Sequence, residues 1–386
     1  LTAMDRIDPI DMSLLDRFQR EFPLDCRPFA RIAETLGISE AEVIERLSLM
    51  LATGRITRVG GTVRPNTAGA STLAALAVPE DRVEEVAAIV GDEPGVNHSY
   101  LREAEWNLWF VATAPDAEAL AEMLARIETK TGRHFSQTNP CMQGASLPPL
   151  WGRTREGGLL GQASAAKPPT PLPSPQRGGE PQGAAPPRQP LPLLDLRLVR
   201  PFNIDLGFPL VGGPVAMPVG RGVETAVLRA NDRPLLDALS RGLDLTPRPY
   251  AALALRLGRD ETAVIARIEV LLAAGILTRL GVIVRHRALG FSANAMVVWD
   301  VHETATQAAG QALATLPGVT LAYERRPVAG FWPYRLYCMI HARSRPEALA
   351  VLETARALPD LAGVDHRILF STRCFKQSGA RLSEAA

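Results

Sequence analysis

The stretch Pro94-Gly-Val-Asn-His-Ser-Tyr-Leu-Arg-Glu-Ala-Glu-Trp-Asn-Leu-Trp-Phe110 places His98, Tyr100 and Arg102 at every second position. Alternate side chains of a β-strand point to the same face. This spacing therefore predicts a strand on which a histidine, a phenol and a permanent cation share one face. A second apolar run begins at Trp106, which indicates a second strand and hence a hairpin.

The chain contains an internal repeat that includes this hairpin. Gly54-Arg-Ile-Thr-Arg58 reappears as Gly275-Ile-Leu-Thr-Arg279, at an offset of 221 residues. Pro94-Gly-Val96 reappears as Pro317-Gly-Val319, at an offset two residues longer. Because the repeat spans nearly all of each half, we interpret the chain as a tandem duplication of one two-domain unit.

A proline-rich segment separates the two copies. Ten of the 26 residues from Lys167 to Pro192 are proline, a composition that favours polyproline II or disorder. Residues 193–227 are more apolar but rich in glycine and proline, and we expect them to pack along a domain surface as an irregular arm. The predicted linker is 146–227.

The first part of each copy predicts a winged helix. Ser39 and Glu42 form a capping box at the start of a helix over 40–52. Residues 56–64 then indicate two short strands that turn around Gly60-Gly61. With the helices before them, these features predict a helix-turn-helix with a wing. The predicted winged-helix domains are 1–66 and 228–287.

The second part of each copy alternates strands and helices in the order βαββαβ. This order predicts a ferredoxin-like domain, an antiparallel sheet with both helices on one face. We expect the last strand of the first copy around Phe135. The predicted domains are 67–145 and 288–380, and the two halves are expected to pair through their free sheet faces. The fold class is α+β.

Composition excludes several classes of protein. The 386 residues carry a formal net charge of +1, which does not indicate a nucleic-acid or membrane-surface protein. The four cysteines form no C-x-x-C pair, so we expect reduced thiols and no zinc site. No run of eighteen uncharged apolar residues predicts a membrane span. The first residues lack the regions of a secretion signal, so we expect a cytoplasmic protein.

The hairpins and wing ends are rich in arginine and in large aromatic residues. Arginine binds carboxylates through two parallel hydrogen bonds, and aromatic rings offer flat apolar surfaces. Together they fit a large, flat ligand fringed with carboxylates, such as a tetrapyrrole. Besides the strand residues named first, the candidate ligand-binding residues are Arg64, Trp106, Asn107, Trp109, Arg285, Arg287, Tyr323, Arg325, Arg326, Trp332, Tyr334, Arg335 and Tyr337.

Three groups of residues resemble the siroheme decarboxylases, which are built from domains of the Lrp/AsnC type. They are residues 285–299 (RHRALGFSANAMVVW), residues 323–326 with 332–337 (YERR and WPYRLY), and residues 97–102 with 106–109 (NHSYLR and WNLW). The resemblance covers both halves, as in a fused two-subunit form. The second hairpin departs from it, since Arg335 stands where the first has Asn107.

The resemblance implies a fold, an activity and a substrate. It implies removal of the C12 and C18 acetate carboxyls of siroheme to give 12,18-didecarboxysiroheme, for heme d1 or an alternative heme pathway. It also implies that no added cofactor is required, because the siroheme iron enters with the substrate, and that no separate metal is bound.

Decarboxylation of a ring-attached acetate needs few protein groups. The macrocycle can delocalise the electron pair, so the protein must hold the carboxylates and deliver a proton to carbon. We assign His98 as the acid, Tyr100 as its assistant and Arg102 as a carboxylate anchor. His286, which lacks a counterpart in the first copy, is the competing acid or a contact to the iron. His341 is expected to pack within the sheet.

Two other functions remain open from the sequence. One is an Lrp/AsnC-type transcription regulator, and the other is a heme-binding sensor in which a histidine ligates iron without turnover. The first candidate recognition helix carries Glu40, Glu42 and Glu45 against Arg46, and acidic helices bind DNA poorly. We therefore do not expect DNA binding. A homodimer of the fused chain is a further hypothesis.

Overall fold

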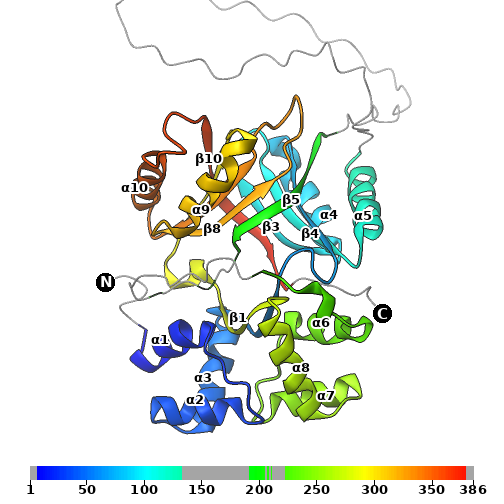
Figure 1. The fold of residues 1–386 in the computed structure, drawn as a ribbon, viewed down its shortest axis with the longest axis vertical. Coiled ribbons are helices and arrows are strands. Elements are labelled where there is room, and N and C mark those ends of the chain that lie inside the picture. Colours follow the sequence, from blue (N-terminus) through cyan, green and yellow to red (C-terminus); the bar gives the residue numbers. More distant parts are fainter. Residues whose placement is uncertain (1–6, 133–190, 205–206, 208–209, 211–221, 380–386) are drawn as a thin grey trace, which may run out of the picture.

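The computed structural model describes residues 7–132, 191–204, 207, 210 and 222–379, and these form two layers (Figure 1). One layer holds the helix-turn-helix units of both copies, and the other is a closed β-barrel with helices on its outside. Each copy of the repeat contributes to both layers. The predicted α+β class is confirmed.

The helical layer contains three α-helices from each copy. The first copy supplies α1 (Pro9–Asp16), α2 (Pro28–Leu36) and α3 (Glu40–Ala52), and the second supplies α6 (Arg233–Arg241), α7 (Pro249–Leu257) and α8 (Glu261–Ala273). Ser39 caps α3 by accepting a hydrogen bond from the Glu42 amide at 3.1 Å. Gly37 ends α2 with a φ of 68°, a left-handed conformation that suits glycine. The helix-turn-helix prediction is confirmed for both copies.

The predicted two-stranded wing is wrong. Residues 56–63 form one continuous strand, β1 (Ile56–Val63), which pairs antiparallel with β6 (Leu277–Val284) of the other copy. The glycines that suggested a turn instead allow β1 and β6 to lie close to backbone carbonyl groups of the neighbouring segments. A Cβ atom on Gly60 would lie 2.4 Å from the carbonyl oxygen of Leu239, and one on Gly281 would lie 2.4 Å from that of Phe18.

The barrel combines two ferredoxin-like sheets. Its strands are β2 (Ala70–Leu76), β3 (Val96–Arg102), β4 (Leu108–Ala114) and β5 (Leu193–Asn203) from the first copy, and β7 (Ala293–Trp299), β8 (Val319–Arg325), β9 (Leu336–Ala342) and β10 (His366–Gln377) from the second. They follow one another in the order β10-β3-β4-β2-β5-β8-β9-β7. The outer helices are α4 (Val83–Asp92), α5 (Ala117–Lys130), α9 (Thr306–Thr315) and α10 (Arg345–Arg356). The predicted βαββαβ order is confirmed.

The last strand of each copy closes the barrel by crossing into the other copy. Residues 193–197 of β5 pair with β2, and its later residues pair with β8. In the same way, β10 pairs first with β7 and then with β3. The closed barrel has no free sheet edge.

The position of β5 corrects the sequence analysis. The expectation of an irregular arm is wrong for residues 193–203, which form a regular strand inside the predicted linker. The glycine and proline content that suggested the arm belongs mainly to the residues after this strand. Phe135, where the last strand was expected, lies outside the described residues, as does most of the predicted linker.

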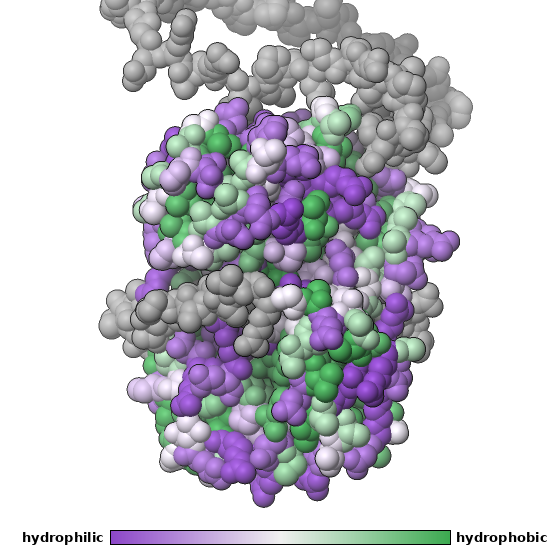
Figure 2. Space-filling model, viewed as in Figure 1, coloured by the Kyte–Doolittle hydropathy of each residue, from purple (hydrophilic) through white to green (hydrophobic). Residues whose placement is uncertain are grey.

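Among the described residues, the buried apolar side chains form four hydrophobic cores. One joins the helices of both copies with β1 and β6, and two lie between the sheets and their outer helices. The fourth fills the barrel interior with side chains from both copies. Figure 2 shows hydrophilic residues across the surface of both layers. Hydrophobic residues lie among them, most clearly on the surface of the helical layer.

Short 3-10 helices connect the main elements. They span Arg17–Gln19, Glu80–Arg82, Thr225–Val227, Ala230–Asp232, His286–Leu289 and Glu303–Ala305. Within the described ranges, no helix is both long and apolar enough to cross a membrane.

Replacement of Gly60 by alanine should destabilise the protein. The added methyl group would overlap the Leu239 carbonyl oxygen, and such overpacking costs about 1–3 kcal/mol. Urea unfolding should show a lower midpoint for Gly60→Ala. The matched control is Gly91→Ala in α4, where nothing outside the backbone of the helix itself lies within 4 Å of the new Cβ. Alanine should stabilise that helix by up to about 1 kcal/mol. Equal midpoints for the two variants would contradict the close approach of β1 to α6.

Candidate active site

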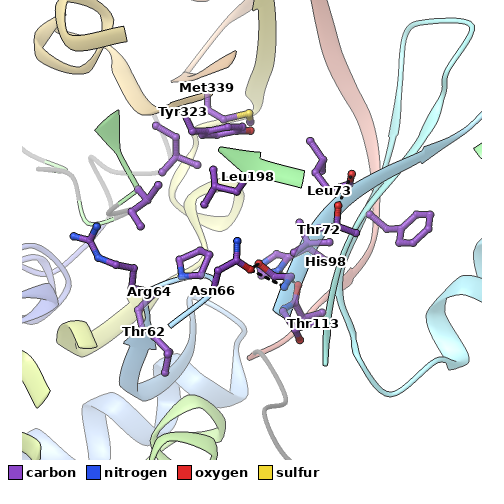
Figure 3. Close-up of a pocket in the computed structure, with 18 of the residues that line it drawn as sticks. Thr62, Arg64, Asn66, Thr72, Leu73, His98, Thr113, Leu198, Tyr323 and Met339 are labelled. Atoms are coloured by element: carbon purple, nitrogen blue, oxygen red, sulfur yellow. Dashed lines mark hydrogen bonds between the residues drawn. The ribbon is translucent and has the colours of Figure 1, made fainter. Parts of the chain in front are cut away.

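A cavity of about 300 Å³ opens between the barrel and the helical layer. Both copies line it: the first supplies Arg58, Arg64, His98, Tyr100, Arg102 and Trp109, and the second supplies Asn294, Met296, Tyr323, Arg325, Met339 and His341. Figure 3 shows Tyr323 and Met339 on one side of the cavity, Thr62 and Arg64 on another, and His98 beside Thr113. The site is therefore built from both halves of the chain.

Three side chains of β3 face this cavity together. His98, Tyr100 and Arg102 all line it, which confirms the strand phase predicted from their spacing. The His98 and Tyr100 rings are nearly parallel, with centroids 6.4 Å apart. His98 Nδ1 lies 2.8 Å from Asn97 Oδ1, an acceptor that places the ring proton on Nδ1. His98 Nε2 is then the nitrogen left to accept a proton.

Arg102 is a buried cation with unused hydrogen-bonding capacity. Its guanidinium donates to Leu369 O at 3.0 Å and to Asn294 Oδ1 at 3.3 Å, and only 6% of the residue is exposed. Among the described residues, no group accepts a hydrogen bond from its Nε. Burial lowers the pKa of Arg102 to about 10, so it stays protonated at neutral pH. An anion in the cavity would gain a desolvated partner here.

The second copy provides a matching pair. Arg325 lies over the Tyr323 ring at 4.7 Å, as Arg102 lies over Tyr100 at 5.6 Å. Arg325 donates from Nη1 to Leu196 O at 2.6 Å, and its buried Nε also has no acceptor in the described part of the chain. Two arginines from opposite halves thus border one cavity.

His98 is neutral when the cavity is empty. Burial, and then the positive charge of Arg58, lower its pKa to about 4. The ring is half-buried because it borders the cavity. Burial also raises the pKa of the Tyr100 hydroxyl. Neither group changes its charge near neutral pH until something else enters the cavity.

His341 packs within the sheet as expected, and it also lies on the cavity wall. Arg102 donates to Asn294 Oδ1, which turns the Asn294 amide nitrogen toward His341 Nε2, 2.7 Å away. His341 Nδ1 then donates to Thr320 Oγ1 at 2.7 Å, and that hydroxyl donates to Met339 O. The network therefore selects the neutral tautomer with its proton on Nδ1. Burial lowers the pKa of His341 to about 4.

His286 lies behind this wall. Its ring centroid is 5.4 Å from that of His341, and His286 itself does not line the cavity. Burial and then the neighbouring His341 lower its pKa. Because His286 does not border the cavity, its position does not support its assignment as a competing acid.

Four of the aromatic residues expected against the ligand belong to the barrel core. Trp106, Trp332, Tyr334 and Tyr337 pack with the interior leucines and valines and do not line the cavity. The Trp332 indole donates to the Tyr337 hydroxyl at 2.7 Å. A closed barrel of this size must be filled with side chains, and these rings fill it. Trp109 and Tyr323 both belong to this core and line the cavity.

Several polar candidates have structural partners away from the cavity. Asn107 makes two hydrogen bonds with the Val78 backbone, and Arg335 pairs with Glu324 and Glu303. Arg287 donates to Ser371.

Of the remaining arginines, Arg285 and Arg326 are exposed and absent from the cavity lining, whereas Arg64 lines the cavity and donates to Gly275 O at 3.1 Å. Only the arginines that the strand and barrel geometry turns inward remain available to a ligand in the cavity.

The candidate residues named from the sequence did not include Arg58. Arg58 lines the cavity beside His98, and burial lowers its pKa to about 10. The sequence did not reveal that Arg58 lines a cavity, because its strand was interpreted as half of a local hairpin. Within the described residues, no group of three or more His, Cys, Asp or Glu side chains is placed to hold a metal ion.

Models of two protein families match both copies of the repeat. The AsnC-like ligand binding domain matches residues 68–138 and 288–376. The siroheme decarboxylase NirDL-like HTH domain matches residues 11–56 and 232–277. The matches alternate along the chain in the same order as the duplicated units.

Relatives resemble the chain as a whole or in one half. The siroheme decarboxylase NirDL subunit of Paracoccus pantotrophus is 54% identical over 381 residues, which is 98% of this chain and 99% of the relative. The siroheme decarboxylase NirD subunit of Pseudomonas aeruginosa is 50% identical over 126 residues, which is 33% of this chain and 84% of the subunit. A solved siroheme decarboxylase NirDL, crystallised with an iron-uroporphyrin III analogue, shares the fold with a TM-score of 0.59 at 21% identity, over 97% of this chain and 94% of that one.

His98 should stay neutral well below the usual pH range of a histidine. In ligand-free protein, NMR of its imidazole should show titration near pH 4, whereas an unfolded histidine titrates near 6.5. Between these values the unfolded chain binds more protons, so stability should fall as pH falls from about 6.5 toward 4. The variant His98→Gln identifies the signal by removing it. Titration of His98 at its ordinary value would contradict the burial and charge described for this site.

Proposed function

The chain belongs to the siroheme decarboxylase family, and from this we propose that it removes two acetate carboxyl groups from siroheme in the cavity between its layers. The products would be carbon dioxide and 12,18-didecarboxysiroheme. The observation that carries the proposal is the pairing of buried arginines that have spare hydrogen-bonding capacity with His98 and Tyr100 in one cavity. A substrate fringed with carboxylates would satisfy these cations.

The reaction divides between the substrate and the chain. When the bond between the methylene carbon and the carboxylate breaks, its electron pair stays on the methylene carbon and spreads into the macrocycle. One proton must then reach that carbon to give a methyl group. The macrocycle supplies delocalisation, so the chain has to hold the remaining carboxylates and deliver the proton.

We assign the proton delivery to His98. It borders the cavity, and its ring is oriented by Asn97 at 2.8 Å. A histidine is an effective donor only when it is protonated, and His98 is neutral in the empty cavity. Substrate binding must therefore charge it. Tyr100, whose pKa is raised by burial, assists as a neutral hydrogen-bond donor.

Arg102 and Arg325 are the proposed carboxylate anchors. Each lies over a tyrosine ring, which limits its motion, and each has a buried Nε without an acceptor among the described residues. Because they come from different halves, a ligand held by both would span the barrel mouth. Water excluded by such a ligand would strengthen the ion pairs.

We propose that no added cofactor takes part. The iron of siroheme enters as part of the substrate, and the macrocycle supplies the electron delocalisation. The ring centroids of His286 and His341 are 5.4 Å apart, and a contact between His341 and the substrate is compatible with its place on the cavity wall.

Transcription regulation is the second candidate, since one family model is that of AsnC-like ligand binding domains. The charges of the first helix-turn-helix argue against DNA binding. Arg46 of α3 pairs with Asp8, Asp11 and Glu42, and Arg27 pairs with Glu40. Cations neutralised in this way add little attraction for a polyanion.

The pathway, assembly and location follow from the same proposal. A fused chain favours heme d1 biosynthesis over the alternative heme pathway. Both halves already lie in one chain, so a homodimer would add an interface without completing the barrel, and light scattering would test it. We expect the chain to work in the cytoplasm.

Anaerobic incubation of the protein with siroheme should yield a product that has lost two carbon dioxide units, as measured by mass spectrometry. Loss of both units would support the proposal. A bound tetrapyrrole with unchanged mass and an altered iron spectrum would instead support a heme-binding sensor. Salt-dependent retardation of promoter DNA without turnover would support a regulator.

The variant His98→Ala should lose turnover by at least about 100-fold, because general acids contribute roughly 10²–10⁴-fold. It should still bind siroheme, since the arginines remain, and an absorbance titration would show this. The control is His302→Ala, which removes an exposed histidine outside the cavity. Full activity in His98→Ala would contradict the assignment of the acid.

A further inference from the structure

Arg58 projects into the cavity from β1, the strand that lies beneath the barrel. Its guanidinium carbon is 3.5 Å from where a Cβ on Gly379 would lie, so it reaches the end of β10 that pairs with His98. Its buried Nε has no hydrogen-bond partner among the described residues, and none of the described carboxylates forms an ion pair with it. A cation held in this way beside a histidine has no evident structural purpose.

The pseudo-equivalent arginine of the second copy is placed differently. Arg279 occupies the same position in β6, but it is only 5% exposed, donates to Gln19 O at 3.4 Å and does not line the cavity. The histidine position differs too, since the second copy has Leu321 where the first has His98. At these two paired positions, an arginine that lines the cavity and a histidine therefore occur together only in the first copy.

We propose that Arg58 is a substrate-binding residue that pairs with one carboxylate of the tetrapyrrole beside His98, and that this pairing allows His98 to take up the proton it delivers. The inference rests on the proposed function, because it names the group that prepares the acid of that reaction. The proton comes from solvent when the substrate binds and leaves on the methyl carbon during turnover.

The charges around His98 make Arg58 the controlling group. On its own strand the titratable neighbour is Tyr100, and β4 contributes none within Leu108–Ala114. On β10, Cys374 faces Tyr100, and Lys376 donates to the carbonyl groups of Gly91 and Glu93 at the C-terminal end of α4.

Beyond α4, the Glu93 carboxylate pairs with Arg126 and Lys130. Among the described residues, Arg58 is the charge that acts on the pKa of His98, after burial.

The sign of the effect follows from electrostatics. In the empty cavity, Arg58 repels a second positive charge and burial penalises it, so His98 is neutral. A carboxylate bound to Arg58 cancels that repulsion and adds an attraction of its own at short range. Both changes raise the pKa of His98. The acid would then be charged only while a substrate carboxylate is present.

Proton uptake on binding tests this inference without turnover. Iron-uroporphyrin III, a tetrapyrrole with acetate carboxyls, serves as the probe in calorimetric titrations at pH 6 in buffers of different ionisation enthalpy. Wild-type protein should take up roughly one proton per bound ligand. His98→Gln should bind with little uptake.

Arg58→Gln should bind at least about tenfold more weakly and should also lose the uptake, because one ion pair and its link to His98 are gone. Arg58→Lys, which keeps the positive charge, should retain part of the proton uptake. The control Arg279→Gln should keep the wild-type uptake, and circular dichroism confirms that each variant is folded.

The outcomes separate this inference from the proposed function. Uptake that is unchanged in a folded Arg58→Gln, with unchanged affinity, would overturn the role of Arg58 even if siroheme is decarboxylated. Wild-type uptake that depends on both His98 and Arg58 would support it even if siroheme were returned intact. A kcat for siroheme in Arg58→Lys that recovers toward wild type, compared with Arg58→Gln, would add support from the reaction itself.

Discussion

The exchange of the last strands between the two copies is the constraint on which the site depends. Strand β5 leaves the first sheet to pair with β8, and β10 leaves the second sheet to pair with β3. The exchange closes the barrel and sets β3 of one copy against strands of the other. His98 and Arg102 can meet Asn294 and Tyr323 only because of this closure. Neither copy alone could enclose the cavity.

Within that frame, the cavity holds charge that the described residues do not neutralise. Arg58, Arg102 and Arg325 each bury an Nε without an acceptor, and a buried polar group left in this way costs about 1–3 kcal/mol. A fold retains such a cost where function requires it. Burial is the main cause that lowers the pKa values of His98 and His341, and it is reinforced by Arg58 at His98 and by Arg102 at His341. Substrate carboxylates would accept hydrogen bonds from these arginines and so remove the cost. Their negative charge would also raise the pKa values of the two histidines.

The sequence predicted the features that depend on local periodicity. The alternation of His98, Tyr100 and Arg102 identified the inward face of β3, and capping identified α3. It failed where partners are distant in the chain. Gly60 suggested a turn, but a glycine is needed there because α6 of the second copy approaches β1 closely. Aromatic residues were assigned to the ligand because a single strand does not reveal how much volume a closed barrel must fill.

Duplication explains how the two copies can contribute different walls to one cavity. Ser71 and Thr113 pair across β2 and β4, and the structurally equivalent pair across β7 and β9 is Asn294 and His341. Small hydroxyl groups leave space in the first copy, whereas the larger side chains of the second form a hydrogen-bonded wall. The backbone pairing that closes the barrel is the same in both. The first copy thus leaves space for the cavity, and the second supplies a hydrogen-bonded wall.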